Sequence, residues 1–371
     1  MSKITKLLAN PRRFLSDAQA NRNWKQVERR RVAYFDPDAP TAILVGFARW
    51  KTFMPAFLAG YNAVYLGHQA PKTAEITRIA SFKRPHVFTW SYKAPSDLRL
   101  FCARNAIPLT YVEDGFIRSF GLGADRSAPA SLVFDDLAMH FDRLQPSRLE
   151  TLLASYDFDA DPQLMEHAHQ LRQLMVTTGL SKYNFQAPPR RLAEVAVPGK
   201  RKILVLGQVE DDLSIRYGAD QPMSGNELVM LAADENPDAQ IFYRPHPESL
   251  AYSKPHYSNP ELVSDVCQIL DQQFSIADCL DNCDKVYSVT SLAGFEAALR
   301  GKPVVTVGAP FYAGWGFTED QLPIARRTRH LTATQVLAAA YLLYPRYSGL
   351  PADAASGDIL TMLRRFASSM N

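Results

Sequence analysis

Two adjacent carboxyl groups stand directly after an apolar run in the first third of the chain. Glu113 and Asp114 follow Leu109–Val112 and precede Gly115. Neighbouring carboxyl groups that are partly withdrawn from water raise each other's pKa, which suits general acid–base catalysis. A turn in which Asp114 caps a helix is the alternative, because Asp-Gly is a common turn pair.

Three consecutive carboxylates, Glu210, Asp211 and Asp212, occur after the apolar run Lys202–Leu206. Carboxylates at the end of a buried strand are costly unless they are exposed to water or used in chemistry. They are therefore candidates for catalysis. Capping of a helix N-terminus by Asp212 or Ser214 is the alternative.

His246 lies between Pro245 and Pro247, after the apolar run Gln240–Tyr243. The prolines restrict the backbone on both sides, so the imidazole is presented in a fixed direction. An imidazole placed after a strand can contact a phosphate or donate a proton. A purely structural histidine is the alternative.

Thr290 and Ser291 precede a helical pattern over Leu292–Arg300. The first turn of a helix offers free N–H groups and the positive end of the helix dipole, which together bind phosphate. Glu296, one turn further along, could accept hydrogen bonds from a ribose. Ordinary helix capping is the alternative. A last segment, residues 309–317, alternates aromatic and small residues, and such a loop can stack on sugars or bases or pack between domains.

Alternating strands and helices must position these segments. Short apolar runs followed by Gly, Pro or Asp predict buried parallel strands, and the longer stretches between them predict helices. The pattern indicates two α/β domains, each resembling a doubly wound sheet. The predicted strands are Ala42–Val45, Ala63–Leu66, His86–Trp90, Leu109–Val112, Lys202–Leu206, Gln240–Tyr243, Lys285–Val289 and Pro303–Val307, and the predicted helices are Ala74–Phe82, Ser96–Asn105 and Leu292–Arg300, the last ended by Gly301.

A linker over residues 186–200, with two adjacent prolines and a Pro-Gly pair, separates the two halves. We expect a basic arm over residues 1–32, an N-terminal Rossmann-like domain over 33–190 and a C-terminal one over 191–345. The segment 346–371 contains a helical stretch that can pack back on the first domain. Because ligands bind beyond the carboxyl ends of such strands, the polar segments of both domains are expected to face one central cleft. That layout is expected of a transferase with a nucleotide in one domain and an acceptor in the other.

Composition and charge exclude several classes of protein. The 371 residues are 47% hydrophobic and 21% charged, with a net charge of +3, which indicates a globular protein and gives no reason to expect nucleic-acid binding. Residues 1–31 hold nine Lys or Arg against Asp17 and Glu28, interleaved with apolar residues. Such an arm suits the anionic inner face of a membrane, with a solvated helix or arm as the alternative. We find neither a run of the ~20 apolar residues that a membrane span needs nor a secretory signal. The four cysteines predict reduced, buried thiols in the cytoplasm.

Taken together, the segments resemble bacterial transferases that use CMP-activated acidic sugars, and more closely the capsular polysaccharide Kdo transferases of the KpsC type. The resemblance runs from about residue 108 to 320 and follows the order of that family's recurring segments. The segments are Glu113-Asp-Gly-Phe-Ile-Arg-Ser119, Ser181-Lys-Tyr-Asn184, Gly207-Gln-Val-Glu-Asp-Asp-Leu-Ser214, His246-Pro247, Thr290-Ser-Leu-Ala-Gly-Phe-Glu296 and Pro310-Phe-Tyr-Ala-Gly-Trp-Gly316.

The resemblance implies a GT-B fold and a retaining β-Kdo transfer from CMP-Kdo through a covalent glycosyl-enzyme. Asp212 would be the nucleophile, with Asp211 as the weaker candidate, and Glu113, beside Asp114, would be the acid/base for the acceptor hydroxyl. The remaining roles are CMP binding by His246, Pro247, Thr290, Ser291 and Leu292, ribose binding by Glu296, and sugar or acceptor binding by Arg118, Ser119, Gln208 and Asn184. Arg118 and Ser119 are assigned to the sugar carboxylate by charge alone.

The same resemblance implies the partners. CMP-Kdo is the donor substrate, and no cofactor or metal is expected because a helix terminus and a histidine can neutralise the single phosphate. The acceptor is expected to be an oligosaccharide or a lipid-linked saccharide. We expect a cytoplasmic protein, with peripheral inner-membrane association and a capsule biosynthesis complex as candidate settings. The best-known relatives carry two such modules, whereas this chain shows one, which predicts a single linkage. Another CMP-activated acidic sugar, such as sialic acid, and a non-catalytic binding subunit are the alternatives.

Overall fold

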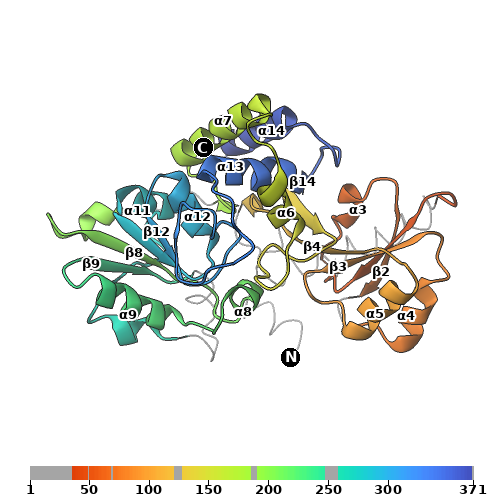
Figure 1. Cartoon of the computed structure of the whole chain (residues 1–371), viewed down its shortest axis with the longest axis horizontal. Helices are drawn as coiled ribbons and strands as arrows, with labels where there is room; N and C mark the ends of the chain where they lie inside the picture. The colour runs from red at the N-terminus through yellow and green to blue at the C-terminus, as the bar shows by residue number, and fades with distance from the viewer. Residues whose placement is uncertain are drawn as a thin grey trace, which may run out of the picture. The chain divides into compact units, whose positions relative to one another are not determined.

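The computed structural model describes residues 36–48, 50–67, 70–120, 128–184, 190–246 and 258–369. The chain forms two compact units, each built on a β-sheet (Figure 1). The first unit comprises the residues up to Met139 with Lys182–Asn184 and Tyr344–Ile359. The second comprises His140–Ser181, Phe185–Leu343 and the residues from Leu360. The arm predicted over residues 1–32 lies outside the described residues.

The first unit holds a six-stranded sheet in the order β14-β6-β4-β3-β1-β2. Strands β1 to β4 run parallel, β6 is antiparallel to β4, and β14 is antiparallel to β6. A small parallel sheet joins β5 to β7. The elements are β1 (Thr41–Val45), α3 (Met54–Phe57), β2 (Asn62–Gly67), α4 (Thr73–Ile79), β3 (Pro85–Trp90), α5 (Ser96–Arg104), β4 (Leu109–Asp114), β5 (Ser119–Phe120), β6 (Ser131–Asp135), β7 (Tyr183–Asn184) and β14 (Pro345–Tyr347).

Both faces of this sheet are covered, and β1 shows why its sequence is continuously apolar. Ala42 and Leu44 pack in the layer that contains α3. Ile43 and Val45 pack in the layer that contains α4 and α5. Because successive side chains of a strand point to opposite faces, a strand buried on both sides reads as an unbroken apolar run.

The second unit holds a six-stranded sheet in the order β10-β9-β8-β11-β12-β13, and all of its pairings are parallel. Its elements are α6 (Arg148–Ser155), α7 (Pro162–Thr178), the 3₁₀ turns η2 (Leu192–Glu194) and η3 (Pro260–Val263), β8 (Lys202–Leu206), α8 (Leu213–Gly218), α9 (Gly225–Glu235), β9 (Gln240–Arg244), β10 (Gln268–Ile269), α11 (Ile276–Asn282), β11 (Lys285–Ser288), α12 (Leu292–Leu299), β12 (Val304–Thr306), β13 (Glu319–Asp320), α13 (Ala333–Leu337), the π-helix η4 (Ala338–Leu343) and α14 (Ser356–Ser368).

The same alternation builds two layers on this sheet. Val205 and Tyr243 pack with α9 on one face, whereas Leu204 and Phe242 pack with α11 and α12 on the other (Figure 1). Gly301 has φ +74°, the left-handed conformation expected of a glycine that ends a helix, and it follows Arg300, the C-cap of α12. All four cysteines are free and buried, as predicted.

The eight predicted strands are all present, with ends shifted by at most two residues. The three predicted helices are α4, α5 and α12, and α4 ends earlier than expected, at Ile79. The prediction of two Rossmann-like domains is confirmed. Strands β6 and β14, which bring antiparallel pairings into the first sheet, were not predicted.

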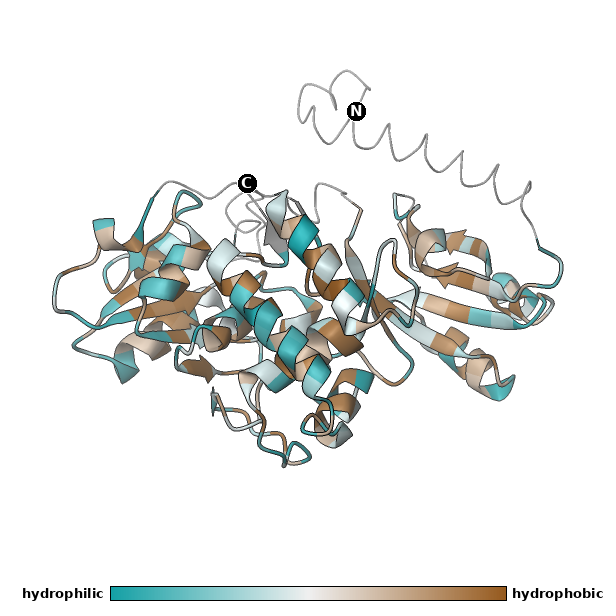
Figure 2. Ribbon diagram, turned by 90° about the horizontal axis from the view of Figure 1, so that it is seen from above, coloured by the Kyte–Doolittle hydropathy of each residue, from teal (hydrophilic) through white to brown (hydrophobic). Residues whose placement is uncertain are grey.

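Helices α6 and α7 group with the second unit, although the sequence boundary at residue 190 assigns them to the first domain. Their contacts explain this grouping. Arg172 of α7 donates to the carbonyl oxygen of Leu299 at 2.6 Å, and Gln170 of the same helix accepts from Arg364 of α14 at 2.6 Å. Figure 2 shows hydrophilic and hydrophobic residues alternating along the helices, as expected of helices with one buried face.

Candidate active site

In each sheet the strand order reverses at one place, where doubly wound folds bind their ligands beyond the carboxyl ends of the strands. In the second unit the reversal falls between β8 and β11. Gln208 follows β8, and Thr290 follows β11. In the first unit the reversal falls between β1 and β3, and β4 lies beside β3.

Gln208 and Thr290 bond directly to each other at the reversal of the second sheet. The Thr290 N–H donates to Gln208 Oε1 at 2.7 Å, and Gln208 Nε2 donates to Thr290 Oγ1 at 3.0 Å. Thr290 Oγ1 also donates to Ser214 Oγ of α8 at 3.2 Å. The structure therefore brings together residues from two predicted segments that lie about eighty positions apart. The amide of Gln208 and the hydroxyl groups of Thr290 and Ser214 form one cluster, the Thr290 cluster.

Glycines allow the chain to close around Thr290. A Cβ atom on Gly308 would lie 2.7 Å from Thr290 Cγ2, and one on Gly218 would lie 3.0 Å from the same methyl carbon. A Cβ atom on Gly207 would lie 2.8 Å from Pro245 Cα and 3.1 Å from the nitrogen of His246. Only glycine therefore fits between the end of β8 and the residue that precedes His246 without displacing backbone.

Ser291 is the N-cap of α12, and its hydroxyl accepts from the N–H of Ala293 at 3.3 Å. Tyr312 Oη fixes the same residue by donating to the Ser291 carbonyl oxygen at 2.6 Å. The capping alternative is thus realised for Ser291. Leu292 is the first residue of α12, so its backbone belongs to the helix terminus that was predicted to receive a phosphate.

Glu296 is 5% exposed, and its Oε1 accepts from Ser181 Oγ at 2.6 Å. This hydrogen bond joins two of the family's recurring segments, because Ser181 is the first residue of the segment 181–184 and Glu296 is the last residue of the segment 290–296. The side chain of Asn184 is not among the described ones, and its backbone lies in β7.

The three consecutive carboxylates have different surroundings. Glu210 Oε1 accepts from the N–H of Gly225 at 3.0 Å, and Glu210 Oε2 accepts from the N–H of Ser258 at 3.1 Å, so this residue fastens loops. Asp211 and Asp212 are exposed to solvent. Asp212 is the N-cap of α8, and its Oδ1 accepts from the N–H of Ser214 at 2.8 Å. Asp212 is therefore fixed beside the Thr290 cluster through Ser214.

His246 is partly buried and follows β9 after Pro245. Pro247 lies outside the described residues. The close approach of Gly207 to the His246 nitrogen places the imidazole-bearing residue beside the segment that carries Gln208.

In the first unit, Glu113 and Asp114 are the last two residues of β4 and are partly buried. Withdrawal from water, followed by the neighbouring Asp114 carboxylate, raises the pKa of Glu113 to about 7. Glu113 Oε1 accepts from the N–H of Asp114 at 3.0 Å. A carboxyl group of this kind can take and return a proton near neutral pH.

Arg118 is fully buried, and its Nε donates to Asp114 Oδ2 at 2.9 Å while Nη1 donates to Ser119 Oγ at 2.7 Å. The two residues assigned to a sugar carboxylate thus bond to each other and to Asp114. Gly115 is required here because a Cβ atom would lie 2.1 Å from Ser131 Oγ of β6.

The aromatic segment 309–317 packs inside the second unit. Trp315 and Tyr312 are fully buried, and Trp315 Nε1 donates to the carbonyl oxygen of Phe311 at 2.9 Å. Arg327 donates to the carbonyl oxygens of Pro310 at 2.6 Å and Ala313 at 2.8 Å. This burial excludes stacking of Trp315 or Tyr312 on a sugar or base, and both side chains pack within the second unit.

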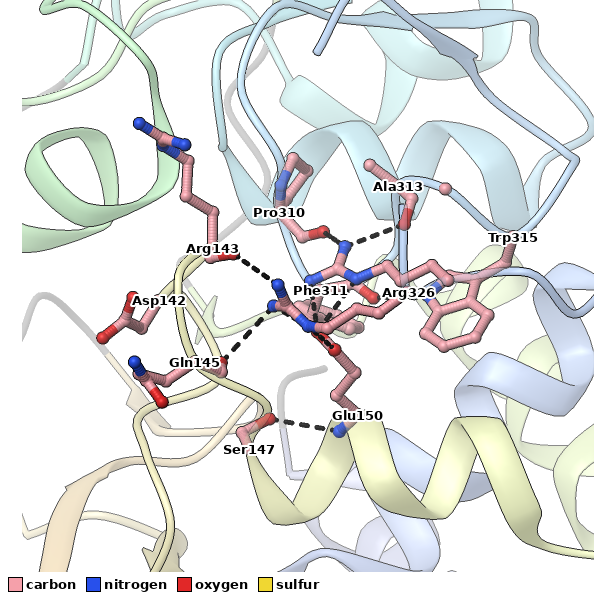
Figure 3. A network of polar contacts seen from close by, with 12 residues as sticks. Asp142, Arg143, Gln145, Ser147, Glu150, Pro310, Phe311, Ala313, Trp315 and Arg326 are labelled. Carbon is pink, nitrogen blue, oxygen red and sulfur yellow. Dashed lines mark hydrogen bonds and ion pairs between the residues drawn. The ribbon is translucent and has the colours of Figure 1, made fainter. Parts of the chain in front are cut away.

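Glu150 of α6 anchors this segment, and sequence reasoning missed it. Arg326 pairs with the Glu150 carboxylate through Nε and, at 3.1 Å, through Nη2, while Arg327 Nε donates to it at 3.0 Å (Figure 3). Lys51, after β1, was also missed. The signal for Lys51 was a Trp-Lys pair shortly after a predicted strand, whereas Glu150 offered none.

Among the described residues, no group of three or more His, Cys, Asp or Glu side chains is arranged to hold a metal ion. In the same part of the chain, no helix is long and apolar enough to cross a membrane.

Two Rossmann-like units with polar clusters beyond their strands match the fold of GT-B-like glycosyltransferases. The chain belongs to the family of capsule polysaccharide biosynthesis proteins, whose profile matches residues 86–348. Lipopolysaccharide-processing protein LpsZ of Rhizobium meliloti is 38% identical over 311 residues, which are 83% of this chain and 70% of that protein. Capsule polysaccharide modification protein LipA of Neisseria meningitidis serogroup B is 39% identical over 277 residues, which are 74% of this chain but 38% of LipA.

Two solved structures of Thermosulfurimonas dismutans KpsC are similar to this chain. Its β-Kdo 2,4 transferase has a TM-score of 0.70 and 30% identity, with 86% of this chain and 97% of that one covered. Its β-Kdo 2,7 transferase has a TM-score of 0.67 and 29% identity, with 88% and 99% covered.

Proposed function

We propose that the chain is a retaining glycosyltransferase that moves β-Kdo from CMP-Kdo to a saccharide acceptor in capsule polysaccharide biosynthesis. The observation that carries the proposal is the likeness to two KpsC chains named as β-Kdo transferases, of which 97% and 99% are covered. The polar groups at the reversal of the second sheet are of the kinds that a nucleotide phosphate needs.

In this proposal the second unit binds CMP. The helix terminus at Ser291 and Leu292, the Thr290 hydroxyl and the His246–Pro247 pair receive the phosphate, and Glu296 receives the ribose. A helix N-terminus with a neighbouring hydroxyl and imidazole can neutralise one phosphate group, so no metal or other cofactor is proposed.

The chemistry would proceed by two displacements. The carboxylate of Asp212 attacks C2 of the Kdo unit, and the C2–O bond to CMP breaks with its electron pair going to the phosphate oxygen. The acceptor hydroxyl then gives its proton to Glu113 and attacks C2, and the bond to Asp212 breaks. Two inversions restore the β configuration. Asp211 is the second candidate for the nucleophile, and Asp114 is proposed to support Glu113.

Sugar and acceptor groups are proposed to meet Gln208 and Asn184. For Arg118 and Ser119 we narrow the role to holding Asp114 in place, because their polar atoms bond to Asp114 and to each other. The acceptor is proposed to be an oligosaccharide or lipid-linked saccharide. The proposed setting is the cytoplasmic face of the inner membrane, by peripheral association through the basic arm and within a capsule biosynthesis complex.

A transfer assay tests the proposal. The protein is incubated with CMP-Kdo, CMP-sialic acid or UDP-glucose and a Kdo-terminated oligosaccharide, and the products are identified by mass spectrometry. We expect addition of one Kdo unit from CMP-Kdo alone. Transfer from CMP-sialic acid instead would move the proposal to another acidic sugar, and CMP-Kdo binding without CMP release with any acceptor would favour a binding subunit.

A further inference from the structure

Lys51 lies in the loop after β1, at the point where the order of the first sheet reverses. The residue is only 6% exposed, and its Nζ lies 2.9 Å from the centroid of the Trp90 ring and 4.4 Å from that of Trp50. Its backbone is fixed as well, because its N–H donates to the Ala48 carbonyl oxygen at 2.9 Å and its own carbonyl oxygen accepts from Tyr65 Oη at 3.2 Å. The ammonium group is therefore held in one place at the carboxyl edge of the sheet.

The ammonium of Lys51 has three N–H donors but makes no hydrogen bond or ion pair with any described residue. The surrounding rings attract it through their π faces, which offsets part of the cost of burial. Burial nevertheless lowers the pKa of Lys51 to about 8, against the opposing influence of Asp114 and Glu113 and with further lowering by Arg118 and Lys93. A buried cation to which the described residues offer no acceptor is costly unless an anion reaches it.

Two other buried polar atoms at this edge have no hydrogen-bond partner within the described residues, namely Asp114 Oδ1 and Ser91 Oγ. Ser91 follows β3 directly, next to Trp90, and has φ +46°, a backbone conformation that is rare outside glycine. Unpaired buried polar atoms and local backbone strain concentrate where proteins bind ligands. The edge therefore offers a cation, a hydroxyl and a carboxylate oxygen that the described residues leave without partners.

We propose that Lys51 is a substrate-binding residue whose ammonium receives the carboxylate of a sugar acid beside Glu113 and Asp114. Arg118 is the other buried cation of this cluster, and it already donates to Asp114 and Ser119. Lys51 is therefore better placed than Arg118 to bind the sugar carboxylate. Asp114 Oδ1 and Ser91 Oγ are then available to hydroxyl groups of the same sugar. The inference deepens the proposed function and rests on it for the identity of the sugar, which can belong to the donor or to the acceptor.

Equilibrium binding tests this inference without requiring turnover. Ligand-observed NMR titrations compare methyl glycosides of Kdo, sialic acid and glucuronic acid with their counterparts in which the carboxyl group is reduced to an alcohol. CMP and CMP-Kdo are titrated in parallel. The proteins are the wild type, Lys51→Met, Lys51→Gln and the matched control Lys83→Met. Lys83 is half-exposed and pairs with Asp38 on the surface. Melting curves check that each variant is folded.

We expect the wild type and Lys83→Met to bind at least one acid about 10- to 100-fold more tightly than its reduced form, the range for a hydrogen bond to a charged group. Both Lys51 variants should lose this preference while binding CMP unchanged. If only their affinity for CMP-Kdo falls, the carboxylate belongs to the donor, and if only their affinity for the glycosides falls, it belongs to the acceptor.

The inference would be overturned if the wild type bound none of the acids, whether donor or glycoside, more tightly than its neutral form. This outcome decides the matter even if a Lys51 variant fails to fold. A preference that survives in folded Lys51→Met would overturn it too. Lys51-dependent binding of another sugar acid with no binding of Kdo or CMP-Kdo would support the inference and count against the proposed function.

Discussion

Glu113 has a pKa raised to about 7, chiefly because its carboxyl group is withdrawn from water next to Asp114. The folded protein therefore holds a proton on this group that the unfolded chain, with a carboxyl pKa near 4.5, has already lost. Binding of this proton therefore stabilises the folded state. The stabilisation is complete below pH 4.5 and is lost as the pH rises through about 7. The buried carboxyl group thus costs stability at the pH where it could act as a base.

Glu113→Gln should remove that cost together with the activity. We expect its melting temperature to rise relative to the wild type as the pH increases from 4.5 to about 7 and the difference to be constant above that range. Transfer should fall by about 100- to 10,000-fold, the usual contribution of a general base. Scanning calorimetry and kcat/KM over the same pH range check both effects, and a melting difference independent of pH would contradict the assignment.

Asp212 combines two roles that can be separated by substitution, because it caps α8 and is the proposed nucleophile. Asparagine is also a good N-cap, so Asp212→Asn should keep the melting temperature while Asp212→Ala should lose about 0.5–2 kcal/mol of stability. Both should reduce kcat by at least about 1,000-fold, as expected when a nucleophile is removed. Asp211→Asn is the matched control and should keep transfer. Full activity in Asp212→Asn would contradict the assignment of Asp212 as the nucleophile. Loss of activity only in Asp211→Asn would assign that role to Asp211.

At the scale of elements, Gly218 at the end of α8 and Gly308 after β12 leave room for Thr290, which follows β11. Gly308→Ala should displace Thr290, since the new Cβ would lie 2.7 Å from Thr290 Cγ2 and 3.0 Å from two carbonyl oxygens. We expect weaker CMP binding. Thr290→Ser lacks the obstructing methyl group and keeps the hydroxyl that bonds to Gln208, so it should partly restore CMP affinity in the double variant. Calorimetric titration with CMP compares the wild type, the two single variants and the double variant. The free energies of CMP binding should show a coupling of about 0.5–3 kcal/mol between the two substitutions, and strictly additive effects would contradict the proposed packing.

Eight parallel strands of the two sheets could be predicted because parallel strands buried on both faces are continuous apolar runs. Strand β14 has only three residues and begins with a proline, and β6 follows no helical pattern, so the alternation of strands and helices indicated neither. The candidate site was predictable where polar residues directly follow strands, as at Glu113 and Thr290. Lys51 was not, because its importance comes from the rings and carboxyl groups that the fold assembles around it.

At the scale of the whole molecule, ion pairs between distant segments determine which helices belong to which unit. Glu150 and its partners Arg326 and Arg327 are more than 170 residues apart, so no local pattern predicts their contact. Their pairing, with the Arg172 contact to Leu299, explains why α6 and α7 group with the second unit.

Glu150→Ala should leave two partly or fully buried guanidinium groups without their carboxylate. Breaking a buried ion pair from one side costs about 3–5 kcal/mol, so we expect a loss of that size in the free energy of unfolding. Glu166→Ala on α7 is the matched control, since within the described residues Glu166 accepts one exposed hydrogen bond, from Gln170, and it should change stability by less than about 0.5 kcal/mol. Equilibrium urea unfolding measures both, and equal small effects would contradict the anchoring role.

The proposed role of the basic arm over residues 1–32 is association of the whole protein with a membrane. Deletion of residues 1–31 should release the protein from vesicles that contain anionic lipid and leave transfer to a soluble acceptor within about twofold. Each Lys or Arg near an anionic surface contributes about 1 kcal/mol, so nine of them should produce binding that high salt reverses. Vesicle sedimentation at low and high salt measures this, and retention of the truncated protein on vesicles would contradict it.

Retaining transfer of β-Kdo would leave its mark in the anomeric configuration of the product. The protein is incubated with CMP-Kdo and a Kdo-terminated acceptor, and the purified product is analysed by NMR, with Asp212→Asn as the control. We expect one new β-linked Kdo residue, formed by the wild type and not by the variant. An α-linked product, or no Kdo transfer at all, would contradict it.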